Sequence, residues 1–508
     1  MNRKQRRETA AASGGAAFVE AFNQGLDCQR AGQLDQAAIH YRKAMALNPR
    51  SAMVLNNFSV LLYNQGNLTE AEALQRRAIQ YDPNNGMAYN NLGVTLNALH
   101  KHAEAIPFFK RGSALQPGNA RPINNLGDSL VKSGRFEEGI AYLKKAIQLD
   151  PLYAEAHSNH GMALWGMGQL DEAVSSIRHA IKLEPQLFQA RKNLGIVLLM
   201  KGDFAEGWRE YEFRPLDDPA IPRNYRIPRW QGQPLKPGEK LLVWSEQGVG
   251  DEILYANMMR DVKARGVNAL WEADPRLVPL FKRSAPDTEF FNRVIPPVLE
   301  FPPDIVAQIP VASLGQYLRP SSAHFPRARY LKADTARAQI LRARLGLAPG
   351  EKLIGMSWLS KNVAFGENKS TSLSDWGDIF RIPNLKFVNL QYGDTRVERE
   401  KLKKKFGVEV LHIDDLDQHN DLDGVAALAS ACDLVVTVSN STAHIAGGLG
   451  IPTWVLVPLG VGKFWYWGFN TETTPWYPSV TIIRQDIQMD WRPTLRRVAE
   501  RLRAFAGP

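Results

Sequence analysis

Cysteine is scarce in this chain, with only Cys28 and Cys432 among 508 residues. Two isolated cysteines exclude a disulfide framework and a cysteine-based zinc site, and they favour a reducing compartment. No apolar run approaches the roughly 18–20 residues that span a bilayer. The basic residues at 1–7 are not followed by the apolar core of a secretory signal. We therefore expect a cytoplasmic protein without a membrane span.

The excess of positive charge is modest, with 62 Lys and Arg against 52 Asp and Glu and a net charge of +10. Phosphates, acidic proteins and nucleic acid are all compatible with this sign. The positive residues are spread along the whole chain, however, and no nucleic-acid-binding module is present. We expect a generally basic surface and no nucleic-acid partner.

Proline marks a fixed period in the first two fifths of the chain. Pro49, Pro83, Pro117, Pro151 and Pro185 lie 34 residues apart, and each follows an amphipathic, alanine-rich stretch. Proline in this place ends the second helix of a pair. The period resembles that of the tetratricopeptide-repeat superfamily. About six units over 18–221 predict an α-solenoid with a long concave groove, and 1–17 is expected to be a disordered basic tail.

Small residues recur on the same period. They occupy the first helix of each unit at Gly25, Ser59, Gly93, Gly127, Gly161 and Gly195, and the second helix at Ala37, Ala71, Ala105, Gly139, Ala173 and Gly207. Small side chains at both positions let the two helices of a pair approach closely.

Asparagine occupies one position in all six units, at Asn23, Asn57, Asn91, Asn125, Asn159 and Asn193. Asparagine is a mediocre helix former, and its carboxamide both donates to and accepts from a peptide backbone. The column resembles the asparagine ladder of the O-GlcNAc transferase family, which grips extended polypeptide. We expect these residues to bind peptide; the alternative is that they cap or bridge neighbouring repeats.

A proline-rich linker at 222–238 separates the repeats from a second architecture. Beyond it, short apolar runs alternate with helical stretches, which is the pattern of βαβ units on a parallel sheet. Strands are expected at 241–244, 268–272, 353–358, 386–390, 434–438 and 453–457. Two doubly wound units, 239–346 and 347–508, would enclose a ligand cleft at the carboxyl ends of their strands.

The loop that follows the first of these strands contains Gly248, Gly250 and Asp251 directly before a helix. Glycine lets a ligand approach the backbone, and a helix start favours negative charge. The loop is not a dinucleotide fingerprint, because Ile253 stands where the third glycine would be. Asp251 is either a helix cap or a general base at the mouth of the cleft.

A second polar loop, 438–448, again joins a strand to a helix. The hydroxyls of Ser439, Ser441 and Thr442, beside Asn440 and the free N–H groups of a helix start, predict a phosphate site. His444 lies in the first helical turn. It is either a donor to a phosphate oxygen or a hydrogen-bonded core histidine.

A third loop, 360–374, is hydrophilic and contains lysine. Lys369 and Ser370 are expected to face the cleft, where a lysine neutralises a diphosphate without a metal. Lys361 is expected to be solvated.

Together these loops resemble the two-Rossmann (GT-B) glycosyltransferase fold, and specifically the heptosyltransferase-like family found fused to tetratricopeptide repeats in bacteria. The resemblance covers about 241–508. It rests on the turn 246–251, the passage 429–438, the Ser/Thr-x-x-His-x-Ala-Gly motif ending at Gly447, and the aromatic stretch 476–478. It implies that Asp251 activates the acceptor and that 439–444 binds the donor. Relatives often carry aspartate where Ser439 stands, so heptose specificity does not carry over.

The implied function is transfer of a sugar from a nucleotide sugar to a hydroxyl of a protein held by the repeats, with no metal and no further cofactor. Asp251 would take the acceptor proton while Lys369 and the 439–444 loop stabilise the departing nucleotide diphosphate. Two alternatives remain open. One is transfer to an envelope saccharide, with the repeats serving assembly; the other is a non-catalytic interaction scaffold.

Overall fold

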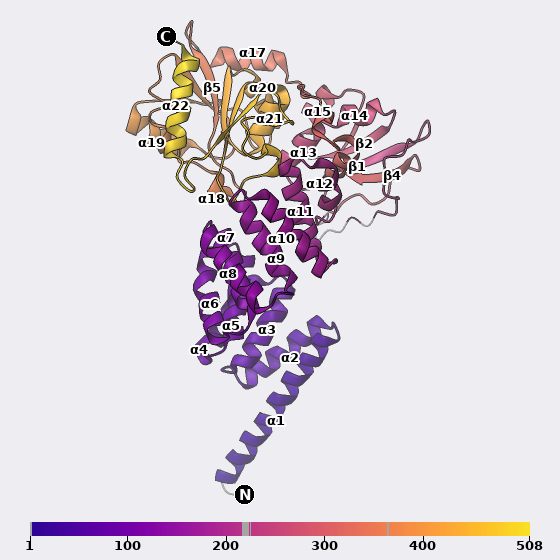
Figure 1. Cartoon of the computed structure of the whole chain (residues 1–508), viewed down its shortest axis with the longest axis vertical. Helices are drawn as coiled ribbons and strands as arrows, with labels where there is room; N and C mark the ends of the chain where they lie inside the picture. Colours follow the sequence, from indigo (N-terminus) through magenta and orange to yellow (C-terminus); the bar gives the residue numbers. More distant parts are fainter. Residues whose placement is uncertain (1–2, 216–222, 224, 363–364, 508) are drawn as a thin grey trace. The chain divides into compact units, whose positions relative to one another are not determined.

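A computed structural model describes residues 3–215, 223, 225–362 and 365–507, with side chains from residue 15 onward. Two compact units, Met1–Pro185 and Gln186–Pro508, divide the chain (Figure 1). Within the described ranges, no helix has both the length and the apolar character needed to cross a membrane.

The first unit is a solenoid of paired helices. Its elements are α1 (Arg3–Arg30), α2 (Leu34–Leu47), α3 (Ala52–Asn64), α4 (Leu68–Tyr81), α5 (Gly86–Ala98), α6 (His102–Leu115), α7 (Ala120–Lys132), α8 (Phe136–Leu149), α9 (Ala154–Gly166) and α10 (Leu170–Leu183). Helix α1 already begins at Arg3, where we expected a disordered tail. Its Lys, Gln, Arg, Glu and Ala residues are good helix formers, which is the local reason for the difference.

The turn inside each pair needs a left-handed backbone. The residues at this turn are Gly32, Gly66, His100, Gly134 and Gly168, with φ between 58° and 82°. Glycine adopts this conformation without steric cost, whereas a residue with a Cβ atom is strained there by about 1–2 kcal/mol. The turn therefore repeats on the same 34-residue period, with His100 as the exception.

The expected close approach of paired helices is present. A Cβ atom on Gly93 would lie 2.6 Å from the Phe109 ring, and one on Gly161 would lie 2.4 Å from Ile177 Cγ1. Gly25 and Gly127 meet Tyr41 and Leu143 in the same way. Each of these four glycines thus faces one large side chain of the second helix, and this contact forms part of the core of the repeat.

The second unit opens with the sixth helix pair, α11 (Phe188–Lys201) and α12 (Phe204–Tyr211). Trp208 explains this grouping, because its indole N–H donates to the Arg319 carbonyl at 3.0 Å and its ring packs against Trp465 at 5.3 Å. The boundary expected at 221–222 lies outside the described residues, as does residue 224 of the predicted linker.

Two parallel sheets follow. The strands are β1 (Lys240–Trp244), β2 (Asn268–Ala273), β3 (Glu289–Asn292), β4 (Ile305–Pro310), β5 (Lys352–Ser357), β6 (Leu385–Asn389), β7 (Val410–Leu411), β8 (Leu434–Val438), β9 (Thr453–Val457) and β10 (Val480–Arg484). The accompanying helices are α13 (Val249–Ala256), α14 (Met259–Ala264), α15 (Val278–Ser284), α16 (Gly315–Leu318), α17 (Thr335–Arg344), α18 (Gly366–Lys369), α19 (Arg396–Phe406), α20 (Leu422–Ser430), α21 (Ser441–Leu449) and α22 (Arg492–Ala506). Short 3-10 turns lie at η1 (Val311–Leu314), η2 (Ser322–His324), η3 (Leu373–Trp376) and η4 (Trp465–Trp467).

The order of the strands determines where a ligand can bind. The first sheet has the order β3-β2-β1-β4 and the second has the order β10-β9-β8-β5-β6-β7, with parallel pairing throughout. The order reverses between β1 and β4, and again between β5 and β8. In open parallel sheets the crevice lies at the carboxyl ends of the strands at this reversal. The loops after β1, β5 and β8 therefore take the site positions.

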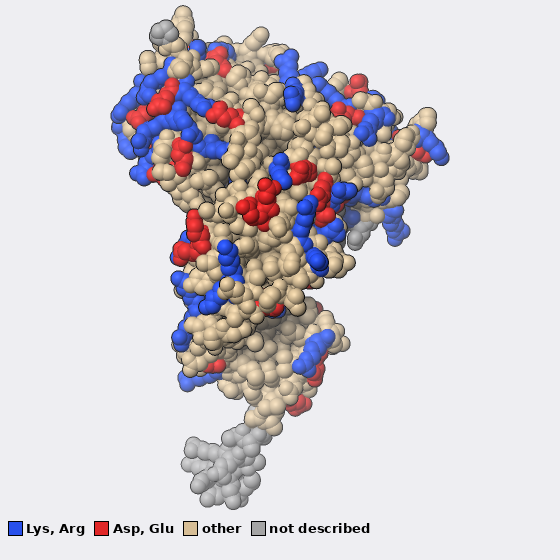
Figure 2. Space-filling model, in the orientation of Figure 1, with Lys and Arg blue, Asp and Glu red and all other residues tan. Residues whose placement is uncertain are grey.

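Basic side chains are densest over α19 and α22. Each helix carries a net charge of +4, with six basic and two acidic residues on α19 and five basic and one acidic on α22. Figure 2 shows the corresponding blue side chains gathered over this side of the second unit. The charge is thus more concentrated than the expected even spread.

Candidate functional site

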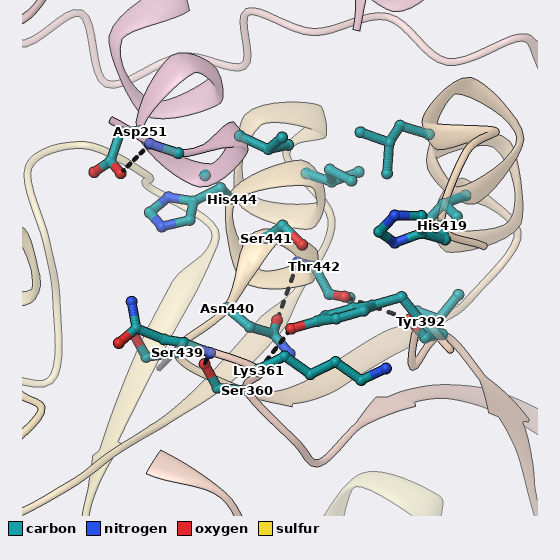
Figure 3. Close-up of a pocket in the computed structure, with 18 of the residues that line it drawn as sticks. Asp251, Ser360, Lys361, Tyr392, His419, Ser439, Asn440, Ser441, Thr442 and His444 are labelled. Carbon is teal, nitrogen blue, oxygen red and sulfur yellow. Dashed lines mark hydrogen bonds between the residues drawn. The ribbon is translucent and has the colours of Figure 1, made fainter. Parts of the chain in front are cut away.

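A cavity of about 330 Å³ lies where the loops after β1, β5 and β8 meet. It is lined by Gly248, Gly250, Asp251, Lys369, Ser439, Asn440, Ser441, Thr442 and His444, together with residues that the sequence did not single out. Figure 3 shows Asp251 and His444 on one side and the Ser439–Thr442 loop below them. Segments almost 200 residues apart in the chain are thereby brought to one cavity.

Asp251 combines the two roles considered for it. Its Oδ2 accepts a hydrogen bond from the Gly248 N–H at 3.2 Å, so it caps the first turn of α13. Its side chain also lines the cavity. Burial raises the pKa of Asp251 to about 6, against the opposing effects of the Gly248 N–H and the Lys369 ammonium. A carboxylate with this pKa is ionised at pH 7 and is suited to accept a proton.

Lys369 is a buried ammonium that faces the same cavity. Its side chain is 4% exposed, and its Nζ lies 4.6 Å from the centre of the Phe464 ring. Burial lowers its pKa to about 8, and Asp251 acts in the opposite direction. No ion pair of Lys369 is found among the described residues. An anion entering the cavity would therefore meet a cation that has little competing partner charge.

The Ser439–Thr442 loop presents one main anion-binding element. Ser441 opens α21, and its N–H and hydroxyl have no hydrogen-bond partner in the described part of the chain. A helix N-terminus with an unpaired N–H attracts negative charge. Thr442 is buried and its hydroxyl donates to the Leu390 carbonyl at 3.4 Å. Ser439 accepts from the Trp467 indole N–H at 2.8 Å, so its hydroxyl oxygen is already engaged.

Asn440 holds the loop in place. Its amide donates to Ser357 Oγ and the Leu359 carbonyl, and its Oδ1 accepts from the Thr442 N–H and the Thr437 hydroxyl. These four bonds use the full capacity of a carboxamide. We therefore revise its role: Asn440 lines the cavity but orients α21 and retains no hydrogen-bonding capacity for a donor molecule.

The structure does not place Ser370 at the cavity, where we expected it. It does not line the cavity among the described residues. Its hydroxyl donates to the Gly366 carbonyl at 2.7 Å and accepts from the Ser360 N–H at 3.0 Å. Sequence proximity to Lys369 does not bring Ser370 to the ligand, because Ser370 caps the short helix α18 and its hydroxyl is engaged within this loop.

His444 is a buried, neutral histidine at the cavity wall. Its Nδ1 lies 2.8 Å from the Tyr477 hydroxyl, and its ring stacks on Trp467. Burial, and to a lesser extent the Lys369 ammonium, lower the pKa of His444 to about 3. A Cβ atom on Gly250 would lie 3.1 Å from its ring, which explains glycine at that position. His444 is thus a hydrogen-bonded core histidine, which was one of the two expected alternatives. Any contact that it makes with a ligand would be made by a neutral ring.

Several cavity residues were not expected from the sequence. Arg276 and Lys361 add two cations, while Tyr392 and His419 contribute rings 6.4 Å apart. Lys361 is exposed, as expected, and it also lines the cavity, with its backbone N–H donating to the Tyr392 hydroxyl. Each lies after a strand or before a helix, and the strand order rather than a local sequence pattern brings it to the cavity.

A buried ion pair holds the Asp251 loop from behind. Arg214, just after the sixth helix pair, makes two hydrogen bonds of 2.6 and 2.8 Å with the Glu246 carboxylate. Both side chains are at most 2% exposed. Gln247 also donates to the Tyr211 hydroxyl at 3.2 Å. The sixth pair therefore fixes the loop that carries Asp251.

The asparagine column has a structural role in three repeats. The amides of Asn91, Asn125 and Asn159 donate to an asparagine of the preceding repeat that lies one residue before the column, each at 3.0 Å; the acceptors are the Oδ1 atoms of Asn56, Asn90 and Asn124. Asn57 donates to its own helix at Met53, and Asn23 is exposed. Asn193, in the second unit, is buried and accepts from Gln189. Bridging of neighbouring repeats is therefore present, and peptide binding by this column stays a prediction.

Comparison with known proteins supports the reading of the helical pairs. Family models described as TPR repeat and tetratricopeptide repeat match residues 22–86, 61–120, 127–168 and 154–187. The amino-terminal region is a tetratricopeptide-repeat array. These matches do not extend to the two parallel sheets.

One curated relative extends over more of the chain. Protein FlbA of Caulobacter vibrioides is 35% identical over 329 residues, which is 61% of this chain and 54% of FlbA. The chain thus spans about half the length of this relative.

Solved structures resemble the chain over about a third of its length. YrrB, described as a TPR protein with an unusual peptide-binding site, is 26% identical and covers 34% of this chain and 89% of its own, with a TM-score of 0.28. TTC0263 of Thermus thermophilus is 20% identical and covers 36% of this chain and 99% of its own, with a TM-score of 0.32.

Proposed function

We propose that the second unit is a nucleotide-sugar glycosyltransferase of the two-Rossmann type and that the repeats hold a polypeptide acceptor. The observation that carries the proposal is the pairing of a raised-pKa carboxylate, Asp251, with a buried ammonium, Lys369, across one cavity. Glycosyl transfer needs a base on the acceptor side and positive charge on the leaving-group side.

Several groups in the cavity would stabilise the leaving group. The Lys369 ammonium and the Ser441 N–H at the start of α21 suit diphosphate oxygens. Arg276 and Lys361 add positive charge. The cavity would thus favour a nucleoside diphosphate over a neutral ligand.

The proposed reaction transfers the sugar directly from the nucleotide sugar to the acceptor hydroxyl. The acceptor hydroxyl loses its proton to Asp251 while its oxygen forms a bond to the anomeric carbon. The bond between that carbon and the diphosphate oxygen breaks, and the electron pair leaves with the nucleotide. Lys369 and Ser441 stabilise the charge that develops on this oxygen. Asp251 then releases its proton to solvent.

The concave groove expected of the repeats supports a polypeptide acceptor. Tetratricopeptide arrays form concave grooves that bind other chains, and the asparagine column recurs on the first helix of each pair. Transfer to an envelope saccharide is the competing proposal.

A transfer assay tests this function. The purified chain would be incubated with each of a panel of nucleotide sugars, with and without casein as an unfolded, serine-rich polypeptide. We expect one nucleotide sugar to release its nucleotide faster with casein present, and casein to gain the mass of one or more sugars. Asp251→Asn is the control for background hydrolysis. Nucleotide release that never depends on polypeptide, with no mass gain, would favour the saccharide alternative. No nucleotide release under any condition would favour the scaffold.

A further inference from the structure

Gln75 is a polar residue in a core position of the second repeat. The same position on the 34-residue period is large and apolar or aromatic in the other five units, with Tyr41, Phe109, Leu143, Ile177 and Tyr211. Burying a carboxamide in place of such a side chain is unfavourable unless both of its polar atoms find partners. The position that Phe109, Leu143 and Ile177 pack against is glycine, whereas the second repeat has Ser59 there.

The structure leaves the oxygen of this carboxamide unsatisfied within the described ranges. Gln75 is 1% exposed, and its Oε1 has no hydrogen-bond partner among the described residues. The hydroxyl of Ser59 does not supply the partner, because it donates to the Asn56 carbonyl at 2.6 Å. Thr95, on the next repeat, is fully buried, and its hydroxyl likewise has no partner among these residues. Unpaired buried polar atoms are rare in folded proteins and require an explanation.

Both residues line a hollow of about 320 Å³ within the repeats. Gln75 comes from α4, and the other walls come from α3, α5, α7 and the start of α9, so the hollow lies along the first helices of four successive repeats. Asn91 and Asn125 of the asparagine column line it as well. Two unpaired buried side chains therefore coincide with a cavity large enough for a small polar group.

The charges at the hollow favour an uncharged ligand. Arg121 and Glu155 both line it, so that a cation and an anion are present together. The Tyr153 hydroxyl donates to Glu155 Oε2 at 2.8 Å, which further engages that carboxylate. Gln75 Oε1 requires an N–H or O–H donor, whereas the Thr95 hydroxyl can donate to an acceptor. A ligand that satisfies both must carry a donor and an acceptor close together.

We propose that this hollow binds the carboxamide side chain of an asparagine or glutamine in an extended polypeptide. A primary carboxamide offers two N–H donors and one oxygen acceptor within one planar group. It therefore complements Gln75 and Thr95. Asn91 and Asn125 each use one amide N–H to bridge the repeats, and each retains a second N–H for the polypeptide backbone. This inference rests on the proposed function in so far as the polypeptide is the acceptor of the sugar.

The test measures peptide binding without any nucleotide. Fluorescein-labelled peptides of sequence Ser-Ala-X-Ala-Ser, with X as glutamine, leucine or glutamate, would be titrated with the full chain by fluorescence anisotropy. We expect the glutamine peptide to bind about three- to ten-fold more tightly than the leucine peptide, the range that one net hydrogen bond provides. The glutamate peptide should gain no comparable preference.

Variants make the test specific to the hollow. Gln75→Leu restores the apolar residue type of this column, and we expect it to abolish the glutamine preference while raising the Tm of the chain. Thr95→Val should reduce the preference without unfolding. Ile177→Leu changes the same column in the fifth repeat and should leave the preference intact.

Two results would overturn the inference. One is a glutamine preference that is absent in the wild type or equal in wild type, Gln75→Leu and Thr95→Val. The other is a lower Tm for Gln75→Leu, since it would show that the carboxamide already serves the fold. A chain that binds the glutamine peptide but no nucleotide would preserve this inference while contradicting the glycosyltransferase proposal.

Discussion

Asp251 and Lys369 face one cavity, and each influences the charge of the other. Lys369 lowers the pKa of Asp251 and Asp251 raises that of Lys369, yet burial dominates in both cases and brings the two pKa values to about 6 and about 8. Between these values the carboxylate is ionised and the amine is protonated. The pair is then ready to accept a proton and to bind an anion at the same time.

Transfer activity should therefore have a bell-shaped pH dependence. We expect kcat/KM to fall below about pH 6, as Asp251 becomes protonated, and above about pH 8, as Lys369 loses its proton. Because the groups interact, the two limbs report the pair rather than either residue alone. Initial rates between pH 5 and 9.5 measure this profile. A flat profile over this range would contradict the assignment of both groups.

Replacement of Asp251 should separate chemistry from binding. Asp251→Asn retains an oxygen that can accept from the Gly248 N–H, so the start of α13 should persist. We expect kcat to fall by about 10²–10⁴-fold, the usual contribution of a general base, while the nucleotide Kd changes little. Single-turnover rates and equilibrium titration measure the two quantities. A much weaker nucleotide Kd with an unchanged kcat would show that Asp251 serves binding and not chemistry.

The ion pair between Arg214 and Glu246 should matter for the stability of the second unit. Both side chains are buried, so Arg214→Met leaves an unpaired carboxylate and should cost about 3–5 kcal/mol. The double variant Arg214→Met with Glu246→Gln removes that charge and should recover part of the loss. Thermal unfolding of wild type, both single variants and the double variant measures the coupling. Additive effects would show that the pair does not act as a unit.

The asparagine column should divide into two groups in a stability assay. Asn91→Ala, Asn125→Ala and Asn159→Ala each remove an inter-repeat hydrogen bond of 3.0 Å, and we expect each to lower the unfolding free energy by about 1 kcal/mol. Asn23→Ala serves as the control, because Asn23 is exposed and makes no such bond among the described residues. Urea denaturation provides the values. Equal effects at all four positions would contradict the bridging role.

The repeats were predictable because their signal is periodic. Proline, glycine and asparagine recur at fixed spacing, so each unit reinforces the interpretation of the others. The sequence could not show that α11 and α12 belong with the second unit. That grouping depends on Trp208, whose partners Arg319 and Trp465 lie more than 100 residues away. Strands β3, β4, β7 and β10 were missed; β3 and β7 have only four and two residues, whereas β4 and β10 are as long as the strands that were predicted.

The site was only partly predictable for a related reason. Gly250, Asp251 and Ser441 follow strands in recognisable polar loops, and the structure brings these loops together. Arg276 and His419 have no local pattern, since their place in the cavity follows from the strand order. Asn440 and Ser370 were assigned to the ligand from residue type alone, whereas their hydrogen bonds are used within the fold. The sequence already contains the polar Gln75 at a position that is apolar or aromatic in the other repeats. Only a comparison of equivalent positions along the 34-residue period reveals this difference.

Nucleotide binding is the most direct test of the central claim that the cavity holds a nucleotide-sugar donor. Thermal unfolding would be measured for the wild type and Lys369→Ala with UDP, GDP, ADP, CMP and their sugar conjugates. We predict that one nucleotide stabilises the wild type, by about 2.7 kcal/mol at 100 times its Kd, and that Lys369→Ala weakens the shift. If no nucleotide changes the Tm of the wild type, or if Lys369→Ala responds as the wild type does, the donor site is not in this cavity.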